Sequence, residues 1–158
     1  MRSLKINSDK RIYVGAQKEF GYFSTNRIGG LDYHSLSSGL NPQIVSNIWN
    51  IHIIDNRIYF QGDRYIFCYE NSKIIPIDCN GVSCSGPVKN KLYFSNRQGI
   101  SYIINKKIVH IPNSSFLNKN KIVEFLPYKG KLLIITQEHG TYLYDGKVFS
   151  RPFTTIDN

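Results

Sequence analysis

Short apolar stretches, each opened by a basic residue, recur four times along the chain. They occupy residues 11–15, 57–61, 91–95 and 131–136, and each is followed within a few residues by further apolar stretches. Their first apolar residues are 12, 58, 92 and 132, which gives spacings of 46, 34 and 40 residues. Repeats of this length built from short strands are typical of β-propeller blades. We therefore predict an all-β fold, a partial β-propeller of about four blades with four antiparallel strands each.

Turn residues divide each repeat into four predicted strands. The expected strands are 3–7, 11–15, 20–24 and 31–36; 47–54, 57–61, 65–70 and 73–77; 82–88, 91–95, 100–104 and 107–111; and 121–128, 131–136, 141–144 and 147–151. Asp145-Gly146 is the strongest tight-hairpin signal in the sequence. The whole chain, 1–158, then reads as one propeller segment whose blades span approximately 2–38, 44–78, 81–112 and 121–153.

The second predicted strand of most repeats is apolar without alternation. Ile12-Tyr13-Val14, Ile58-Tyr59-Phe60 and the run 132–135 are continuous. A strand facing water on one side alternates apolar with polar residues, whereas a strand covered on both faces does not. We expect these strands to be covered on both faces, and we expect helix to be nearly absent because no segment carries a sustained helical period.

Loops at one rim of the predicted blades supply the candidate binding residues. In a propeller, the links between blades (here 37–46 and 112–120) emerge beside the turns between second and third strands, and such loops commonly carry function. The polar residues of those turns can be solvated turn residues or a ligand-binding rim. The rim candidates are Gln17, Glu19, Arg64, Arg97, Gln98, Glu138 and His139.

Charge and composition give little support to nucleic-acid binding, disulfide pairing or a zinc site. The net charge is +9, but the basic residues stand beside predicted turns without a stripe of interleaved aromatics, which argues against nucleic-acid binding. Three cysteines cannot all pair within the chain; Cys68 reads as a small strand hydrophobe, and Cys79 and Cys84 lie near a loop without further zinc ligands.

The histidines and the single tryptophan are the remaining candidates for metal or ligand binding. His34, His52, His110 and His139 lack metal-ligand spacing and read as strand or rim residues. We predict no catalytic residue, no metal and no cofactor. Trp49 can stack on a sugar ring, although a lone tryptophan in an apolar strand is more often part of the core.

No membrane or export segment is expected within the chain. The longest apolar runs, such as 65–69, are far shorter than a transmembrane helix. The start of the chain turns polar by Asn7, so it does not read as a signal peptide.

Two stretches of the sequence resemble a known repeat. Residues 12–23 followed by 31–36, and residues 132–149 with Thr136, Gly140 and Asp145-Gly146-Lys147 in step, are similar to the two-component-regulator propeller repeats of Bacteroidetes-type sensors. The ending 151–155 resembles the same repeat.

The resemblance implies a sensory function. Such sensors carry periplasmic propeller blades, a triple-tyrosine domain, a membrane segment and an output module such as a histidine kinase, and they typically report on glycans. It therefore implies a non-catalytic, extracytoplasmic ligand-binding segment with an oligosaccharide as ligand. We also expect self-association, because blades without neighbours expose apolar faces. The alternatives are a protein-interaction scaffold or, third, a propeller enzyme such as a lyase or glycosidase.

Overall fold

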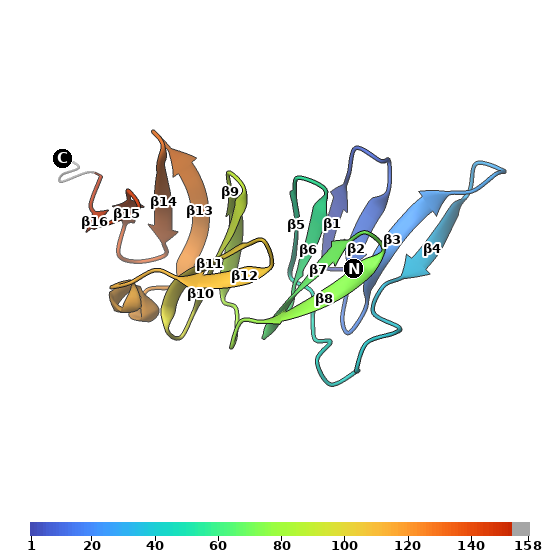
Figure 1. Cartoon of the computed structure of the whole chain (residues 1–158), viewed down its shortest axis with the longest axis horizontal. Helices are drawn as coiled ribbons and strands as arrows, with labels where there is room; N and C mark the ends of the chain where they lie inside the picture. Colours follow the sequence, from blue (N-terminus) through green and yellow to red (C-terminus); the bar gives the residue numbers. More distant parts are fainter. Residues whose placement is uncertain (153–158) are drawn as a thin grey trace. The chain divides into compact units, whose positions relative to one another are not determined.

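The computed structural model describes residues 1–152, and its regular secondary structure consists almost entirely of short β-strands (Figure 1). The first sheet contains β1 (Ser3–Ile6), β2 (Ile12–Gly15), β3 (Phe20–Thr25) and β4 (Leu31–Ser35). The second contains β5 (Asn50–Ile54), β6 (Arg57–Gln61), β7 (Tyr65–Glu70) and β8 (Lys73–Asp78). The third contains β9 (Cys84–Val88), β10 (Lys91–Asn96), β11 (Gly99–Ile104) and β12 (Lys107–His110). The fourth contains β13 (Ile122–Tyr128), β14 (Lys131–Thr136), β15 (Thr141–Tyr144) and β16 (Phe149–Ser150).

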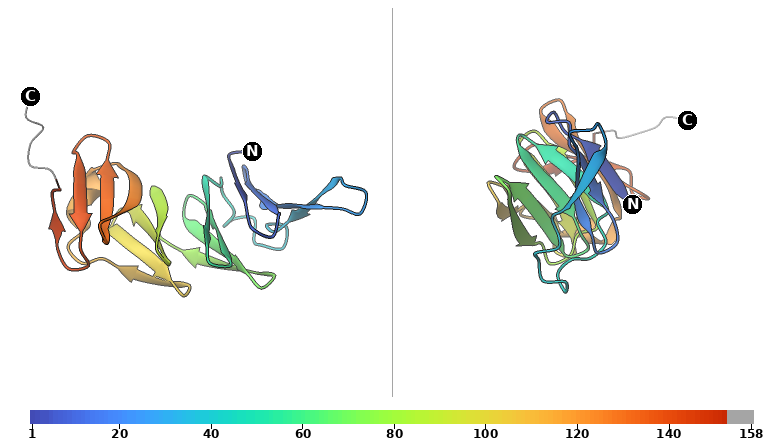
Figure 2. Two further views of the ribbon diagram at one scale, coloured as in Figure 1. Left: turned by 90° about the horizontal axis from the view of Figure 1, so that it is seen from above. Right: turned by 90° about the vertical axis from the view of Figure 1, so that its right-hand side faces the viewer.

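Each sheet is a four-stranded antiparallel meander in which strands adjacent in sequence are adjacent in space. The colours of Figure 2 allow each meander to be followed from two further directions. Several hairpins turn through two residues with positive φ, as at Asn71-Ser72 (51° and 61°) and Asn105-Lys106 (49° and 64°). Two successive positive φ values match the right-handed twist of the flanking strands. The predicted fold class is confirmed: the chain is all-β, with four blade-like sheets of four strands.

Most predicted strand boundaries agree with the structure to within one or two residues, but one predicted strand begins three residues late and another is shortened at both ends. The predicted strand 47–54 begins only at Asn50, because the preceding residues are drawn to the first sheet by the bridge between Gln17 and Asn47. The predicted strand 147–151 is reduced to Phe149–Ser150. Residue 153, the predicted end of the fourth blade, and the repeat-like ending at 153–155 lie outside the described residues.

The Asp145-Gly146 turn explains the second of these errors. The Asp145 carboxylate accepts hydrogen bonds from the backbone N–H groups of Lys147 (2.8 Å) and Val148 (2.9 Å). This side chain-to-backbone bonding competes with strand pairing. The result is a longer turn, in which Tyr144 pairs with Phe149, instead of a two-residue hairpin.

The chain divides into two compact units, Met1–Val82 and Ser83–Asn158, each containing two sheets. In the first unit, β1 and β2 contact β5, so the first strands of the two sheets lie near each other. Phe20 joins the two sheets by packing against Phe60 and Phe67, with ring centroids 4.5 Å and 5.0 Å apart. In the second unit β9 contacts β13, and Phe125, Ile134 and Tyr93 share one apolar cluster.

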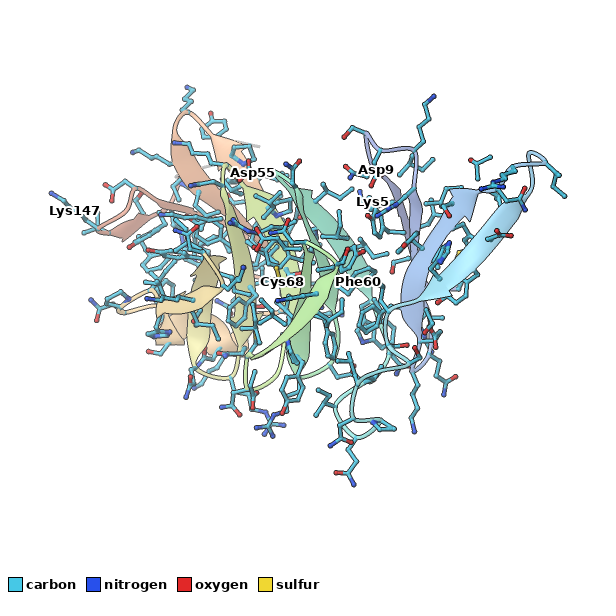
Figure 3. The ribbon with its side chains drawn as sticks, turned by 45° about the vertical axis from the view of Figure 1, so that its right-hand side comes forward. Lys5, Asp9, Asp55, Phe60, Cys68 and Lys147 are labelled. Atoms are coloured by element: carbon cyan, nitrogen blue, oxygen red, sulfur yellow. The ribbon has the colours of Figure 1, made fainter. Side chains whose placement is uncertain are left out.

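The continuous apolar strands are buried on both faces in the second sheet. In β6, Ile58, Tyr59 and Phe60 are all at most 2% exposed. Figure 3 shows Phe60 and Cys68, which belong to neighbouring strands, on opposite sides of this sheet. The prediction of two covered faces is confirmed here.

The same prediction is wrong for the fourth sheet. Leu132 and Ile134 of β14 are 4% and 0% exposed, but Leu133 and Ile135, which alternate with them, are only half-buried. Leu133 pairs directly with Leu126 of β13, which is 40% exposed. One face of this sheet therefore packs on the third sheet, and the other presents leucine and isoleucine side chains to solvent.

The first sheet likewise has an apolar outer face, directed away from the second sheet. Ile6, Ile12, Phe23 and Tyr33 lie directly opposite one another across its four strands. Directly opposed residues of antiparallel strands point to the same side of the sheet. Ile6 is 64% exposed and Tyr33 is 41% exposed, so this row is a solvent-facing apolar strip.

Helical structure within residues 1–152 is limited to a short 3-10 turn, η1 (Ser115–Lys119), in the link between the third and fourth sheets. No helix in the described part of the chain is long and apolar enough to cross a membrane.

Candidate functional site

The meander topology gives every sheet two functionally different ends. The turns between second and third strands, together with the links between sheets, lie at one end, which we call the link end. The turns between first and second strands and between third and fourth strands lie at the other, which we call the hairpin end. The seven predicted rim residues all belong to second-to-third turns and so lie at link ends, as the sequence predicts.

Two of the three rim candidates in the first unit, Glu19 and Arg64, already bind side chains of their own sheets. The half-buried Glu19 carboxylate accepts hydrogen bonds from the hydroxyl groups of Tyr33 and Ser35, both at 2.7 Å. Burial alone would raise the pKa of Glu19, but these hydrogen bonds outweigh it and lower the pKa. Arg64 makes a bidentate ion pair with Asp78, with a shortest distance of 2.7 Å between Nη2 and Oδ2. Gln17 is exposed and forms a backbone bridge with the link residue Asn47.

The four candidates of the second unit lie in two separate exposed turns. Gln98 donates its N–H to the Asn96 side chain at 2.8 Å, and the Arg97 carbonyl accepts from Asn118 at 2.6 Å. The His139 carbonyl accepts from Arg151, and its neighbour Glu138 is exposed. Within each unit, as far as residues 1–152 show, no hydrogen bond or ion pair joins the side chains of any two of these candidates.

A polar hollow of about 280 Å³ lies at the link end of the second unit, between the turn of Arg97 and the link that carries η1. Its lining includes the hydroxyl of Ser95, which is buried and has no hydrogen-bond partner in the described part of the chain. An unsatisfied buried hydroxyl costs free energy unless a water or ligand pairs with it. The hollow can therefore accept a hydrogen-bonding group from outside.

Trp49 is the main feature of the first unit's link end, and of the two interpretations that the sequence left open, the core is the one that its exposure contradicts. Its side chain is 42% exposed. The indole N–H donates to the Asp63 carboxylate at 2.6 Å, a short charge-assisted hydrogen bond that fixes the ring. The Arg2 guanidinium lies over the ring, 4.5 Å from its centroid. The lone tryptophan is thus an oriented aromatic surface beside the predicted rim turn.

The hairpin ends carry a feature that the sequence analysis missed. In each unit a cationic side chain lies over a tyrosine: Arg11 over Tyr22 at 4.6 Å and Lys91 over Tyr102 at 4.3 Å. The signal was present, because a basic residue followed two positions later by tyrosine opens three of the four repeats. The sequence analysis places the basic residues only beside predicted turns and assigns them no aromatic partner.

Two thiols and one imidazole have buried surroundings that keep them uncharged. Burial raises the pKa of Cys79 and Cys84 to about 12, so both thiols stay protonated near neutral pH. Cys68 occupies a buried position in β7, as predicted. Burial, with Lys5 nearby, lowers the pKa of His52 to about 4. Among residues 1–152, no three His, Cys, Asp or Glu side chains gather closely enough to hold a metal ion.

The chain is similar to several solved β-propellers. No protein-family model matches its sequence, and no curated protein sequence matches it. The WD40 β-propeller domain of Doa1 superposes with a TM-score of 0.66 at 14% identity, over 90% of this chain and 50% of that one. Virginiamycin B lyase from Staphylococcus aureus gives 0.65 at 11% identity, over 94% of this chain and 54% of that one. The computationally designed Ika4 protein gives 0.64 at 11% identity, over 90% and 89%.

These similarities identify the fold as β-propeller-like. At 11% to 14% identity they carry no information about ligand or activity. The chain spans about half the length of the first two of these structures.

Proposed function

We propose that this chain is a ligand-binding propeller segment of an extracytoplasmic two-component sensor, that it recognises oligosaccharides, and that it performs no catalysis itself. Two kinds of observation support the proposal. The sequence resembles two-component-regulator propeller repeats, and the fold is propeller-like. The observation that carries the choice of ligand is the exposed, oriented ring of Trp49 at the link end.

The geometry of Trp49 suits a sugar ring. The C–H-rich face of a pyranose packs on a flat aromatic surface, and polar groups around the aromatic ring pair with its hydroxyl groups. Arg2 and Asp63 contact the indole and are themselves exposed, so both can reach a hydroxyl-rich ligand. A guanidinium supplies donors and a carboxylate supplies acceptors, which is the pairing that vicinal hydroxyl groups require.

The exposed area of Trp49 sets the scale of the interaction. With 42% of the residue exposed and aromatic side chains burying up to ~250 Å², a stacked sugar would cover about 100 Å² of indole. At ~25 cal/mol per Å² this contributes about 2.5 kcal/mol. Removing the ring should therefore weaken oligosaccharide binding by a factor of about 30 to 100.

Tryptophan fluorescence is the direct test, because Trp49 is the single tryptophan of the chain. We expect a panel of neutral oligosaccharides to include one that shifts its emission saturably. Calorimetry should then show that Trp49→Ala loses the binding and that Trp49→Phe, which keeps an aromatic face, retains most of it. An unchanged affinity in Trp49→Ala, or no response to any oligosaccharide, would contradict the proposal.

A second candidate function, a protein-interaction scaffold, is favoured by the apolar outer faces of the first and fourth sheets. Monomeric soluble proteins rarely expose contiguous apolar patches of this kind without a partner. We propose that the partner is a second copy of the chain, which brings one outer face against another. Self-association is compatible with ligand binding at the link ends, because the outer faces do not include Trp49.

A further inference from the structure

The hairpin end of each unit contains the same arrangement of one cation and three tyrosines, which we call the cation–tyrosine cluster. The two clusters correspond through strand register: the second-strand tyrosine lies opposite the third-strand tyrosine of its own sheet, and the last tyrosine comes from the neighbouring sheet. The first cluster is Arg11, Tyr13, Tyr22 and Tyr69; the second is Lys91, Tyr93, Tyr102 and Tyr144.

The second-strand and third-strand tyrosines are arranged almost identically in the two clusters. The ring centroids of Tyr13 and Tyr22 are 5.7 Å apart, with an interplanar angle of 53°. Those of Tyr93 and Tyr102 are 5.4 Å apart, with an angle of 50°. The same backbone therefore builds a concave, partly aromatic hairpin end twice, with volumes of about 270 Å³ in the first unit and 200 Å³ in the second.

The first cluster already contains an anion from its own chain. The Asp9 carboxylate accepts the N–H of Arg11 at 3.0 Å and the hydroxyl of Tyr13 at 3.4 Å, and it lies 3.8 Å from the Arg11 Nε. Asp9 reaches this position because the turn between β1 and β2 is one residue longer than its counterpart: 8–10 between Asn7 and Arg11, against 89–90 between Val88 and Lys91.

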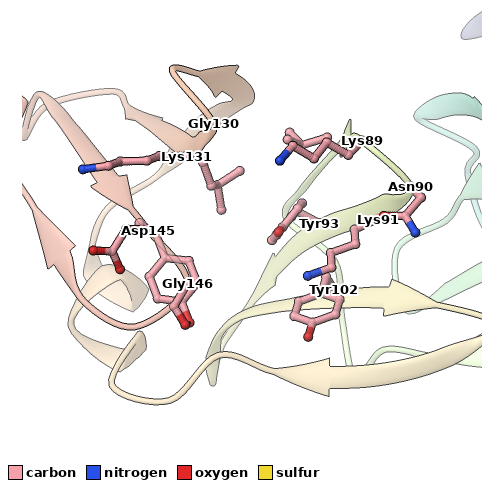
Figure 4. A pocket seen from close by; sticks show the side chains of 12 residues that line it. Lys89, Asn90, Lys91, Tyr93, Tyr102, Gly130, Lys131, Asp145 and Gly146 are labelled. Atoms are coloured by element: carbon pink, nitrogen blue, oxygen red, sulfur yellow. The ribbon is translucent and has the colours of Figure 1, made fainter.

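The second cluster has cations where the first has the carboxylate. The short turn brings Lys89 and Lys91 into the lining of the same hollow (Figure 4). Neither lysine forms an ion pair with any residue in the range 1–152. Lys131 also lines the hollow, but it extends on the side of Asp145, the only acidic residue of the lining (Figure 4).

Hydrogen-bond donors face the same hollow. A lysine ammonium offers three donors and a tyrosine hydroxyl offers one. Burial, with Tyr102 nearby, raises the pKa of Tyr93, so its hydroxyl remains a donor at neutral pH. Two unpaired ammonium groups and a phenolic O–H around a hollow form a complement to a small group bearing several negatively charged oxygens.

We propose that the cation–tyrosine cluster of the second unit is a binding site for a small oxyanion, phosphate or sulfate, either free or as a substituent of a sugar. The hollow of about 200 Å³ is smaller than the roughly 300–1,000 Å³ of sites for drug-sized ligands, which limits the bound part to such a group and its immediate attachment. The first cluster does not bind it, because Asp9 occupies the equivalent position. This inference is independent of oligosaccharide stacking on Trp49, since the two sites lie at opposite ends of the sheets and in different units.

The test is an amide NMR titration of the full chain with sodium phosphate and, separately, sodium sulfate, at ionic strength held constant with sodium chloride. The probes are the amides of Gly130 and Gly146, which line the hollow, and the reference is the amide of Gly29, in the turn between β3 and β4 of the first unit. We expect saturable shifts at Gly130 and Gly146 and none at Gly29. Glucose 6-sulfate is compared with glucose and with free sulfate. If glucose 6-sulfate binds more tightly than free sulfate, the natural ligand is a sulfated or phosphorylated sugar. If the two bind equally, the natural ligand is the free ion.

Matched variants separate the two clusters. Lys91→Met keeps the aliphatic stem over Tyr102 but removes the charge, and it should weaken phosphate binding by about tenfold or more. Arg11→Met, the same change in the first unit, should leave the phosphate affinity unchanged. Dispersed amide spectra of both variants serve as the folding control. Linear, unsaturable shifts, or equal weakening by both variants, would overturn the proposal.

Discussion

The exposed outer face of the first sheet leads to a specific prediction about self-association. Ile6 belongs to a row of apolar side chains that crosses all four strands, and it is 64% exposed. If this face packs against another copy, an acidic residue at position 6 must be buried without a partner. Ile6→Asp should therefore weaken assembly without disturbing the fold, because the side chain makes few contacts within its own chain.

The exposed areas of the residues on this face give the magnitude of the free energy of self-association. Full burial of an isoleucine contributes about 1.5–3 kcal/mol, so covering the exposed two thirds of Ile6 contributes about 1–2 kcal/mol. Leu31, which is 56% exposed on the same face, contributes a similar amount. Counted on both copies, these two residues contribute about 4–8 kcal/mol, which must offset at least ~4 kcal/mol of lost translational and rotational freedom. We therefore expect weak assembly, with a dissociation constant on the order of millimolar, and a loss of at least tenfold in Ile6→Asp.

Sedimentation velocity between micromolar and millimolar concentrations measures this effect. The matched control is Ile28→Asp, which makes the same chemical change at a residue that is 93% exposed in the turn between β3 and β4, outside the apolar row. Because the chain carries a net charge of +9, the measurements need physiological salt or higher to screen repulsion between copies. The reasoning is refuted if the unaltered chain sediments as a monomer at millimolar concentration, or if the two variants assemble equally.

Two further predictions concern stability. Glu19→Gln should be less stable than the unaltered chain at neutral pH: the native pKa of Glu19 is lowered, so its ionised form contributes stability above the unfolded-state pKa of about 4.5 and loses it as pH falls. Thermal unfolding from pH 7 to pH 3 should show the two midpoints converge in acid, and a pH-independent gap would contradict this. Ser114→Ala should cost about 1–3 kcal/mol in urea unfolding, because the buried Ser114 hydroxyl accepts the Ile100 N–H at 2.9 Å. Ser37→Ala, where the equivalent bond to the third strand is 3.4 Å long, should cost less, and equal losses would refute the assignment.

The strands were predictable from sequence because local signals and burial agree. In β6 and β7 the apolar runs, the Asn71-Ser72 turn and the burial on both faces all point to the same boundaries, which the structure reproduces. Asp145-Gly146 does not form the expected two-residue turn, because the aspartate accepts hydrogen bonds within its own turn, an option that the dipeptide alone does not reveal.

Burial and site geometry were less predictable because they depend on neighbours distant in sequence. The run 132–135 looks like the other second strands, yet only one of its faces is packed within its unit. Trp49 follows the buried Ile48 in an apolar context, but Asp63, 14 residues later, draws its indole to the surface. The link-end position of Gln17, Arg97 and Glu138 followed from topology, whereas the contacts that each of them makes required coordinates.

The Asp9 carboxylate acts as a ligand tethered to its own binding site. An external oxyanion at the first cluster must compete with a group whose effective concentration, over so short a tether, is on the order of millimolar or higher. A weakly bound anion cannot displace it at lower concentrations. The length of the first turn of a unit would therefore decide whether its cation–tyrosine cluster can bind an external oxyanion. A single-residue deletion between Asn7 and Arg11 should open the first cluster to oxyanions while the strands and their packing stay the same.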